Sequence, residues 1–148
     1  MKKILVLLAL LISLCACSSG SDLSNLDMKA ATTDLDAAYT NMYDLKEDEL
    51  SLIYGLDVSK CEDYVIKAST LANGDFYAIV KVNKDNESEV LSQMKNLFST
   101  LEQQSNLYSP EAVELIKNRL ETTIGEYHIY LIGKDTKALY DIIKKHIS

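Results

Sequence analysis

Two stretches of the sequence share one pattern, and that pattern limits the folds that the chain can adopt. Each has a glycine, an acidic residue and an aromatic residue, then an apolar run, a Lys-Asp pair and a segment with helical periodicity. The first stretch starts at Gly74-Asp75-Phe76 and the second at Gly125-Glu126-Tyr127. An internal duplication, or the ordinary succession of strand, turn and helix, explains the likeness. Both explanations predict two ββα units.

Each unit should contain a pair of strands. Residues 64–71 and 76–82 are rich in β-branched and aromatic side chains. The Asn73-Gly74 pair between them is typical of a type I′ hairpin turn, which needs positive φ at both positions. Residues 119–124 and 127–132 form the second predicted pair, also with a glycine in the turn.

Apolar residues at three- and four-residue spacing predict helices before, between and after these strands. An N-terminal amphipathic helix should cover about residues 25–45. Asn86 and Glu89 have the spacing of a capping box, which would start the best-defined helix. The remaining helices should be a short one that Gly55 ends, one that Ser109 caps ahead of Pro110, and a last one that Asp135 caps.

These elements predict an α+β fold in one domain, residues 25–148. An N-terminal helix should be followed by the two ββα units, with the helices packed on a four-stranded, mostly antiparallel sheet. A chain of this length buries about two-thirds of its unfolded surface without disulfides or metals. The order of the strands stays open.

The N-terminus has the features of an export signal. Met1-Lys2-Lys3 is positively charged, and residues 4–14 are apolar except for one serine, a run too short to span a bilayer. The following Leu14-Cys15-Ala16-Cys17 resembles the lipobox of bacterial lipoproteins. The resemblance implies transfer of a diacylglyceryl group to Cys17 and cleavage before it. A plain secretory signal with two incidental cysteines is the alternative.

The lipobox divides the chain into three parts. Residues 1–16 would be a lipoprotein signal peptide, residues 17–24 the lipidated cysteine with a flexible polar spacer, and residues 25–148 the domain. Two acyl chains make the attachment effectively permanent, since each buried CH₂ contributes roughly 0.8 kcal/mol. We therefore expect a lipid-anchored protein on the extracytoplasmic face of the cell membrane.

Charge and cysteine content exclude some classes of function. The chain has 15 Lys and Arg against 22 Asp and Glu, a formal net charge of −7. Such an acidic chain without a basic stripe is not expected to bind nucleic acid. After lipidation of Cys17, Cys61 would be the last thiol, so a disulfide framework within the chain is excluded. Cys61 is either a half-buried small side chain, the favoured interpretation, or the site of an intermolecular disulfide or reactive thiol.

Alternation along the strands predicts two faces of the sheet. One face should form the core under the two repeat helices, and its residues are Phe76, Ala78, Val80 and Val82 with Tyr127, Ile129 and Leu131. The opposite face should bring Tyr77 together with His128 and Tyr130. That second face is either an open binding platform or is covered by the N-terminal helix. Coverage is favoured because an exposed apolar patch is costly.

The sequence contains no pattern typical of catalysis. It lacks the nucleophile-elbow, phosphate-loop and dinucleotide motifs. Glu126 and His128 are two potential ligands, whereas a zinc site needs at least three from the protein. The alternating acids Asp85, Glu87 and Glu89 lack the glycine of a calcium loop. No catalytic residue, metal or cofactor is predicted, and an enzyme is the less favoured class.

Four short motifs resemble an uncharacterised domain-of-unknown-function family of small lipoproteins from low-GC Gram-positive bacteria. The motifs are Tyr54-Gly55-Leu56-Asp57, Glu62-Asp63-Tyr64-Val65, Tyr108-Ser109-Pro110-Glu111 and Gly125-Glu126-Tyr127. The resemblance covers about Leu26 to the end and implies a location and a domain shape, but no catalytic residues. Tyr54 and Tyr108 fall in predicted connections, where structure alone demands an aromatic residue least. They are the preferred candidates for a binding site.

Three functions follow as hypotheses. The favoured one is a non-catalytic binding or accessory module that uses Tyr54, Tyr108 and the second sheet face to contact an envelope protein, a peptide or a small ligand. The second is a small cell-envelope hydrolase whose site assembles from distant residues such as Glu126 and His128. The third is a solute-binding lipoprotein, although the chain is short for a two-lobed receptor.

The lipid anchor can be tested by replacing its acceptor thiol. In cells, Cys17→Ser should abolish lipid transfer, so that the protein no longer sediments with membranes when fractions are probed by immunoblot. A variant that still sediments with membranes at the full processed size would contradict the anchor. Cys61→Ser is the matched control and should leave membrane association unchanged.

Overall fold

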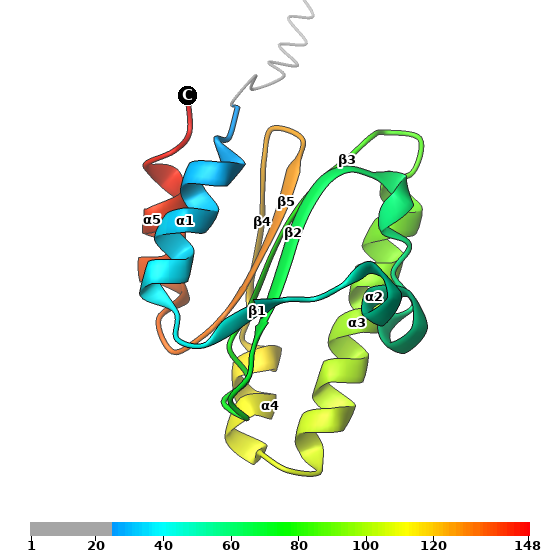
Figure 1. Ribbon diagram of the computed structural model, residues 1–148, viewed down its shortest axis with the longest axis vertical. Coiled ribbons are helices and arrows are strands. Elements are labelled where there is room, and N and C mark those ends of the chain that lie inside the picture. Colours follow the sequence, from blue (N-terminus) through cyan, green and yellow to red (C-terminus); the bar gives the residue numbers. More distant parts are fainter. Residues whose placement is uncertain (1–24) are drawn as a thin grey trace, which may run out of the picture.

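Five antiparallel strands form one sheet in the order β1-β2-β3-β5-β4 (Figure 1). The computed structural model describes residues 25–148, so the predicted signal segment, Cys17 and the predicted spacer lie outside the described residues. The strands are β1 (Met42–Asp44), β2 (Cys61–Ser69), β3 (Phe76–Val82), β4 (Leu120–Ile124) and β5 (Tyr127–Ile132). The predicted α+β class is confirmed, but the sheet has five strands and not four.

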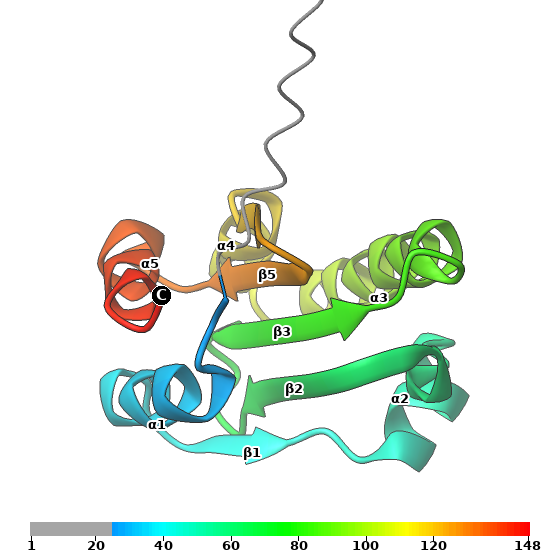
Figure 2. The ribbon, with the colours of Figure 1, turned by 90° about the horizontal axis from the view of Figure 1, so that it is seen from above.

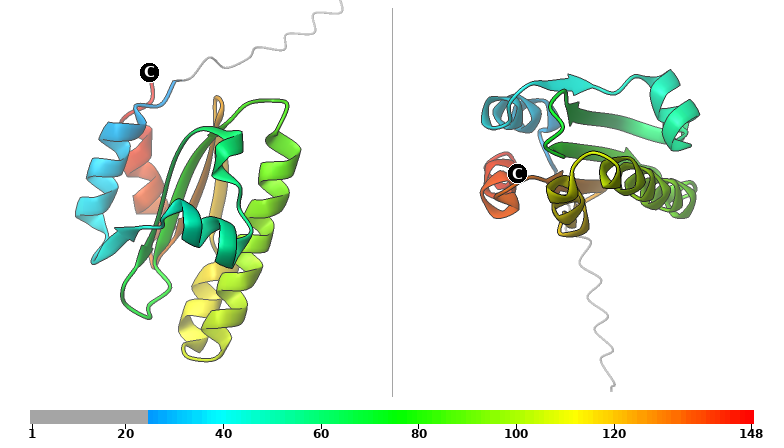
Figure 3. Two further views of the ribbon diagram at one scale, coloured as in Figure 1. Left: turned by 45° about the vertical axis from the view of Figure 1, so that its right-hand side comes forward. Right: turned by 90° about the horizontal axis from the view of Figure 1, so that it is seen from below.

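Helices cover both faces of this sheet. Their bounds are α1 (Met28–Ala38), α2 (Glu47–Tyr54), α3 (Glu87–Asn106), α4 (Pro110–Lys117) and α5 (Thr136–Lys144), with a short 3₁₀ turn at Val58–Lys60. Figure 2 shows α1 and α5 on one side of the sheet and α2 and α3 on the other. Figure 3 shows α4 beside the C-terminal half of α3. Within residues 25–148 no helix has the length and apolar content needed to cross a bilayer.

The fifth strand, β1, comes from the segment predicted to be the end of the first helix. That helix was expected over residues 25–45, but it ends at Ala38. Asn41 then adopts a left-handed backbone (φ 55°), which asparagine tolerates better than most residues. The chain turns there and pairs β1 with the end of β2, Met42 opposite Ser69. Pairing with a distant strand overrides the local helical periodicity.

Two of the predicted helix caps are confirmed, whereas the predicted hairpin turn is wrong. Ser109 and Asp135 accept hydrogen bonds from backbone amides in the first turns of α4 and α5, as predicted. The type I′ turn is wrong, because only Gly74 of the Asn73-Gly74 pair has positive φ. Asn73 instead accepts a hydrogen bond from the backbone N–H of Asp75 through its side chain (3.1 Å).

The predicted capping box is also wrong. Asn86 precedes α3 but its side chain makes no capping bond; its amide points toward the Lys60 carbonyl oxygen. Glu89 forms an ion pair with the ammonium group of Lys60. Both side chains therefore contact Lys60, in the segment before β2, and so hold α3 against that segment. These tertiary contacts take the place of the hydrogen bonds to the first turn of α3 that a capping box would make.

The register between β3 and β5 decides which residues share a face. Tyr77 lies opposite Leu131, and Ala78 lies opposite Tyr130. Two cores result. Phe76, Ala78 and Val80 pack with α2 and α3 in one, while Tyr77, Ile79 and Ile129 pack with α1 and α5 in the other. The predicted grouping of Tyr77 with His128 and Tyr130 is therefore wrong, since cross-strand partners share a face.

The reason for this error lies in the assumed equivalence of the two repeats. The order β2-β3-α3 and β4-β5-α5 occurs in the chain, but α3 and α5 pack on opposite faces of the sheet. Residues aligned by the repeat therefore point to opposite sides. The side-chain period of a strand is two, so an offset of one residue exchanges the faces completely.

Helix α1 is fixed to the sheet by aromatic and polar contacts. The ring of Tyr39 stacks on that of Tyr77 (centroids 5.6 Å apart), and its hydroxyl donates to the Ile132 carbonyl (3.0 Å). The Tyr77 hydroxyl donates to Asp36 (2.7 Å), which Lys67 also contacts at 2.7 Å. Burial, and next the Asp36 carboxylate, raise the pKa of Tyr77. Tyr77 is thus a covered structural residue.

Candidate functional site

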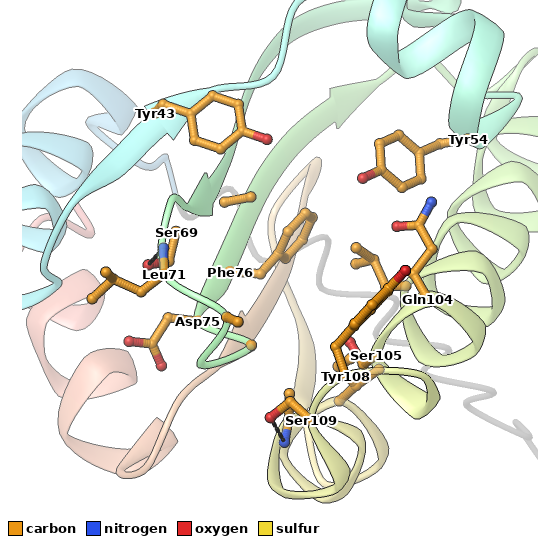
Figure 4. Close-up of a pocket in the computed structure, with 16 residues that line it drawn as sticks. Tyr43, Tyr54, Ser69, Leu71, Asp75, Phe76, Gln104, Ser105, Tyr108 and Ser109 are labelled. Atoms are coloured by element: carbon orange, nitrogen blue, oxygen red, sulfur yellow. Dashed lines mark hydrogen bonds between the residues drawn. The ribbon is translucent and has the colours of Figure 1, made fainter.

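A cleft opens at the end of the sheet where β2 leads into β3 (Figure 4). Its volume is about 230 Å³. Four aromatic side chains line it, namely Tyr43, Tyr54, Phe76 and Tyr108. Apolar side chains of α3 and α4 complete the wall, and Ser69, Gln104 and Ser105 add polar groups. The structure therefore brings together Tyr54 and Tyr108, the two residues preferred from the sequence, although they are far apart in the chain.

Each aromatic residue is placed by the end of an element. Tyr43 lies in the edge strand β1, Tyr54 is the last residue of α2, and Phe76 is the first residue of β3. Tyr108 lies in the tight connection between α3 and α4, where its backbone N–H donates to the Ser105 carbonyl (3.1 Å). Element ends converge here, so the cleft has a rigid frame and a rim formed by short connections.

The loop between β2 and β3 is pressed against α4. A Cβ atom added to Gly74 would lie 2.8 Å from the Cβ and 3.0 Å from the Cα of Ala112. Gly74 also has φ +81°, a conformation that favours glycine. Only a residue without a Cβ atom fits here, and its close approach lets the loop and α4 form one wall of the cleft.

The hydroxyl groups of the cleft differ in their hydrogen bonding. The Tyr43 hydroxyl donates to Glu49 at 3.3 Å. The Tyr54 side chain is mostly buried, but its hydroxyl oxygen keeps some solvent exposure and has no hydrogen-bond partner among the described residues. Burial, followed by Tyr43 and Glu49, raises the pKa of Tyr54. Tyr54 therefore carries a neutral, available hydroxyl at physiological pH, next to an apolar floor.

Asp75 is the acidic residue of the cleft wall. Partial burial raises the pKa of its carboxyl group, against the opposing effects of Asn73 and Lys134. Figure 4 shows its carboxylate directed away from the rings of Phe76 and Tyr108. Among residues 25–148, none that lines the cleft is Lys, Arg or His. The lining is aromatic and weakly polar, and Asp75 is the one charged residue among the described residues that form it.

Most of the large exposed apolar side chains of the described residues line this cleft or the groove beside it. Six large hydrophobic residues are exposed within residues 25–148: Tyr43, Leu52, Ile53, Leu71, Leu107 and Tyr108. Tyr43, Leu71 and Tyr108 line the cleft itself. Leu52 and Ile53 line an adjoining groove that also includes Tyr43. Leu52 and Tyr108 are the most exposed, with 85% and 82% of their surface accessible. We call this set the apolar rim.

His128 and Tyr130 lie elsewhere, in a second cleft of about 270 Å³ between α3 and the β4–β5 pair. The Nε2 atom of His128 lies 3.1 Å from Glu87, and its Nδ1 atom lies 3.4 Å from the Thr123 hydroxyl. Burial raises the pKa of Tyr130 to about 12. The five candidate binding residues are thus divided among the apolar cleft (Tyr54, Tyr108), this second cleft (His128, Tyr130) and the α1-covered core (Tyr77).

Glu126 and His128 do not form a catalytic pair. Glu126 lies in the turn before β5 and its carboxylate is 3.4 Å from the Lys81 ammonium group, whereas His128 contacts Glu87. Among residues 25–148, no group of three or more potential ligands is placed to hold a metal ion.

Cys61 is half-buried at the start of β2. Burial, and to a lesser extent Asp57, raise its pKa to about 11. A thiol with so little thiolate at neutral pH is a poor nucleophile. These properties agree with the interpretation of Cys61 as a small packing side chain.

Sequence reasoning missed most of the cleft lining, including two of its aromatic residues and an exposed leucine. Tyr43 fell within the segment predicted to be the N-terminal helix, and Phe76 was predicted to be a core residue only; both line the cleft. Leu71 was expected to belong to a strand but lies in the loop. Asn41 was the available signal for Tyr43, because asparagine favours a break in a helix and the start of a turn.

Comparison with protein families finds one match. The family described as "Domain of unknown function (DUF4358)" matches residues 35–133, which include all five strands and the whole cleft wall. Comparisons with curated proteins and with solved structures find no match.

The close approach of Gly74 to Ala112 yields a stability prediction. Gly74→Ala should lower the free energy of unfolding by roughly 2–4 kcal/mol, since it adds a clash to left-handed backbone strain. Gly55→Ala is the matched control. Gly55 has φ +68°, but no atom lies within 4 Å of the place that a Cβ would take there, so only about 1 kcal/mol of strain is expected.

Urea denaturation followed by circular dichroism measures both variants. Adding Ala112→Gly to Gly74→Ala should recover part of the loss, after the effect of Ala112→Gly alone is subtracted. Equal destabilisation by the two glycine variants would show that the loop is not held against α4.

Proposed function

Because this chain belongs to the family Domain of unknown function (DUF4358), whose description carries no activity, we propose its function from the geometry of the cleft. It is a non-catalytic binding module that takes an apolar or aromatic group of a ligand between Tyr43, Tyr54 and Tyr108. The single observation that carries this proposal is the gathering of the apolar rim around one preformed cleft.

The physical argument is the cost of exposed apolar surface. Scattered exposed hydrophobic residues are normal, but a contiguous group around a cavity marks a surface that another molecule covers. Tyrosine is suited to such a surface, since it combines a large apolar ring with a hydroxyl and loses little conformational entropy. The available hydroxyl of Tyr54 supplies a directional contact at the buried end, and Tyr108 supplies exposed area at the mouth.

The proposal includes the location expected from the sequence. Cys17 carries the diacylglyceryl anchor, and the domain stands on the extracytoplasmic face of the cell membrane, joined by residues 18–24. The first described residues and the C-terminus lie together at one end of the molecule, where Asn25 hydrogen-bonds Ser148. The β2–β3 connection and α4 lie at the other end (Figure 1). This arrangement leaves the cleft accessible to an envelope protein or peptide.

The other two hypotheses have less support. A hydrolase built on Glu126 and His128 is disfavoured because the two side chains contact different partners. A solute receptor would enclose its ligand, whereas the cleft of about 230 Å³ is smaller than the roughly 300–1,000 Å³ typical of small-molecule sites. A binding module for part of a larger partner fits the cleft better.

Site-specific photo-crosslinking in cells tests the proposed function. The full chain carrying benzoyl-phenylalanine at position 108 should give a covalent adduct of discrete mass on irradiation, since Tyr108 stands at the mouth of the cleft. The same photoreactive group at position 137 is the matched control. Lys137 is equally exposed but lies on α5, away from the cleft, and should give no adduct. Absence of an adduct from position 108, or equal adducts from both positions, would contradict the proposal.

A further inference from the structure

Acidic side chains border the apolar rim on the α2 side. Asp44, Asp48 and Glu49 line the adjoining groove together with Tyr43, Leu52 and Ile53, and Lys46 is the one basic residue of its lining. Tyr43 belongs to both linings, so the cleft and this groove meet at its side chain. An aromatic cavity therefore adjoins an acidic, partly apolar groove.

Two of these carboxylates have no cationic partner within residues 25–148. Asp44 lies 3.5 Å from the Lys67 ammonium group. Asp48 and Glu49 form no ion pair there; Asp48 accepts the Glu49 backbone N–H and Glu49 accepts the Tyr43 hydroxyl. Glu49 thus connects the acidic groove to the aromatic cleft through Tyr43. Unneutralised carboxylates beside an apolar surface favour a ligand that brings its own positive charges.

From this combination, and resting on the function proposed above, we infer that the occupant is a basic peptide segment of another protein. One large apolar or aromatic side chain of the segment fills the cleft between Tyr54, Phe76 and Tyr108. Lys or Arg side chains next to it lie in the groove against Asp48 and Glu49. The cleft, about 230 Å³, has room for one large side chain, and the adjoining groove of about 500 Å³ has room for the residues that flank it.

Charge disfavours the other occupants. A second copy of this chain has a formal net charge of −7 and would bring more acid to an acidic groove. An anionic membrane surface would be repelled for the same reason. The chain's own residues 18–24 contain Asp22 and no Lys or Arg, and they join the domain at the end opposite the cleft. A basic segment is the occupant whose charge complements the groove.

The inference can be tested with three short synthetic peptides. Fluorescence anisotropy measures the affinity of each peptide for the full chain in detergent. The first has a central Phe-Leu pair flanked by lysines, the second has the same pair flanked by glutamates, and the third has lysines around two serines. The first should bind at least about tenfold more tightly than either of the others, since only it satisfies both the cleft and the groove. Equal binding of the lysine and glutamate peptides would overturn the inference.

Variants separate the charge contribution from the cleft itself. The double variant Asp48→Asn, Glu49→Gln should bind the basic Phe-Leu peptide about tenfold more weakly. Its affinity for the glutamate peptide should not fall. The matched control, Asp63→Asn combined with Asp85→Asn, makes the same charge change on exposed residues outside the cleft and groove and should have little effect. The Tyr108→Ser variant should bind every peptide that carries the Phe-Leu pair more weakly.

Identification of the adduct from position 108 distinguishes the failure of this inference from failure of the proposed function. A cross-linked segment that is basic and belongs to another protein supports the inference. A segment of this same chain, a lipid, or an acidic segment would overturn it while leaving a binding module in place. No adduct at all would remove the proposed function and this inference together.

Discussion

The register of the β3–β5 pair is the constraint on which the rest of the structure depends. These two strands occupy the centre of the sheet, and most of their side chains are buried from both sides. Tyr77 opposite Leu131 faces α1 and α5, and Ala78 opposite Tyr130 faces α3. A shift of one residue would move every apolar side chain of a strand to the other face. Both hydrophobic cores therefore fix one register.

The same register sets the position of the cleft. Phe76, the first residue of β3, faces α3, where its ring meets Phe98 edge-on at 5.6 Å. The loop before Phe76 must then pass α4, and Gly74 permits the contact with Ala112. Tyr54 and Tyr108 reach the same place from the ends of α2 and α3. The cleft is a consequence of packing, and its shape is preformed in the free chain.

Features determined by neighbouring residues could be predicted from the sequence. Ser109 and Asp135 cap helices through bonds to amides three residues away, and Gly55 ends α2 with φ +68°. Strand β3 has the predicted bounds, because its run of β-branched and aromatic residues favours a strand without help from distant residues. The α+β fold class could be predicted because it depends only on the order of helices and strands along the chain.

Features determined by distant pairing could not be predicted. Strand β1 exists because residues 42–44 find an edge of β2, although their local pattern is helical. Asn86 has the position of a helix cap, but its side-chain amide donates to the carbonyl oxygen of Lys60, 26 residues earlier in the chain. For the candidate site, Tyr54 and Tyr108 stood out because connections rarely require aromatic residues. Tyr43 and Phe76 did not, since only the folded arrangement brings them to the same cavity.

The function proposed for this domain depends on one claim: that a ligand occupies the cleft at the β2–β3 end and leaves the opposite sheet face undisturbed. Hydrogen–deuterium exchange of the full chain, with and without the basic Phe-Leu peptide, measures this directly. The account predicts slower exchange in residues 43–54, 70–76 and 101–112, with no change in α1 or α5. Protection that appears in α1 and α5, or that is spread evenly over the sheet, would contradict it.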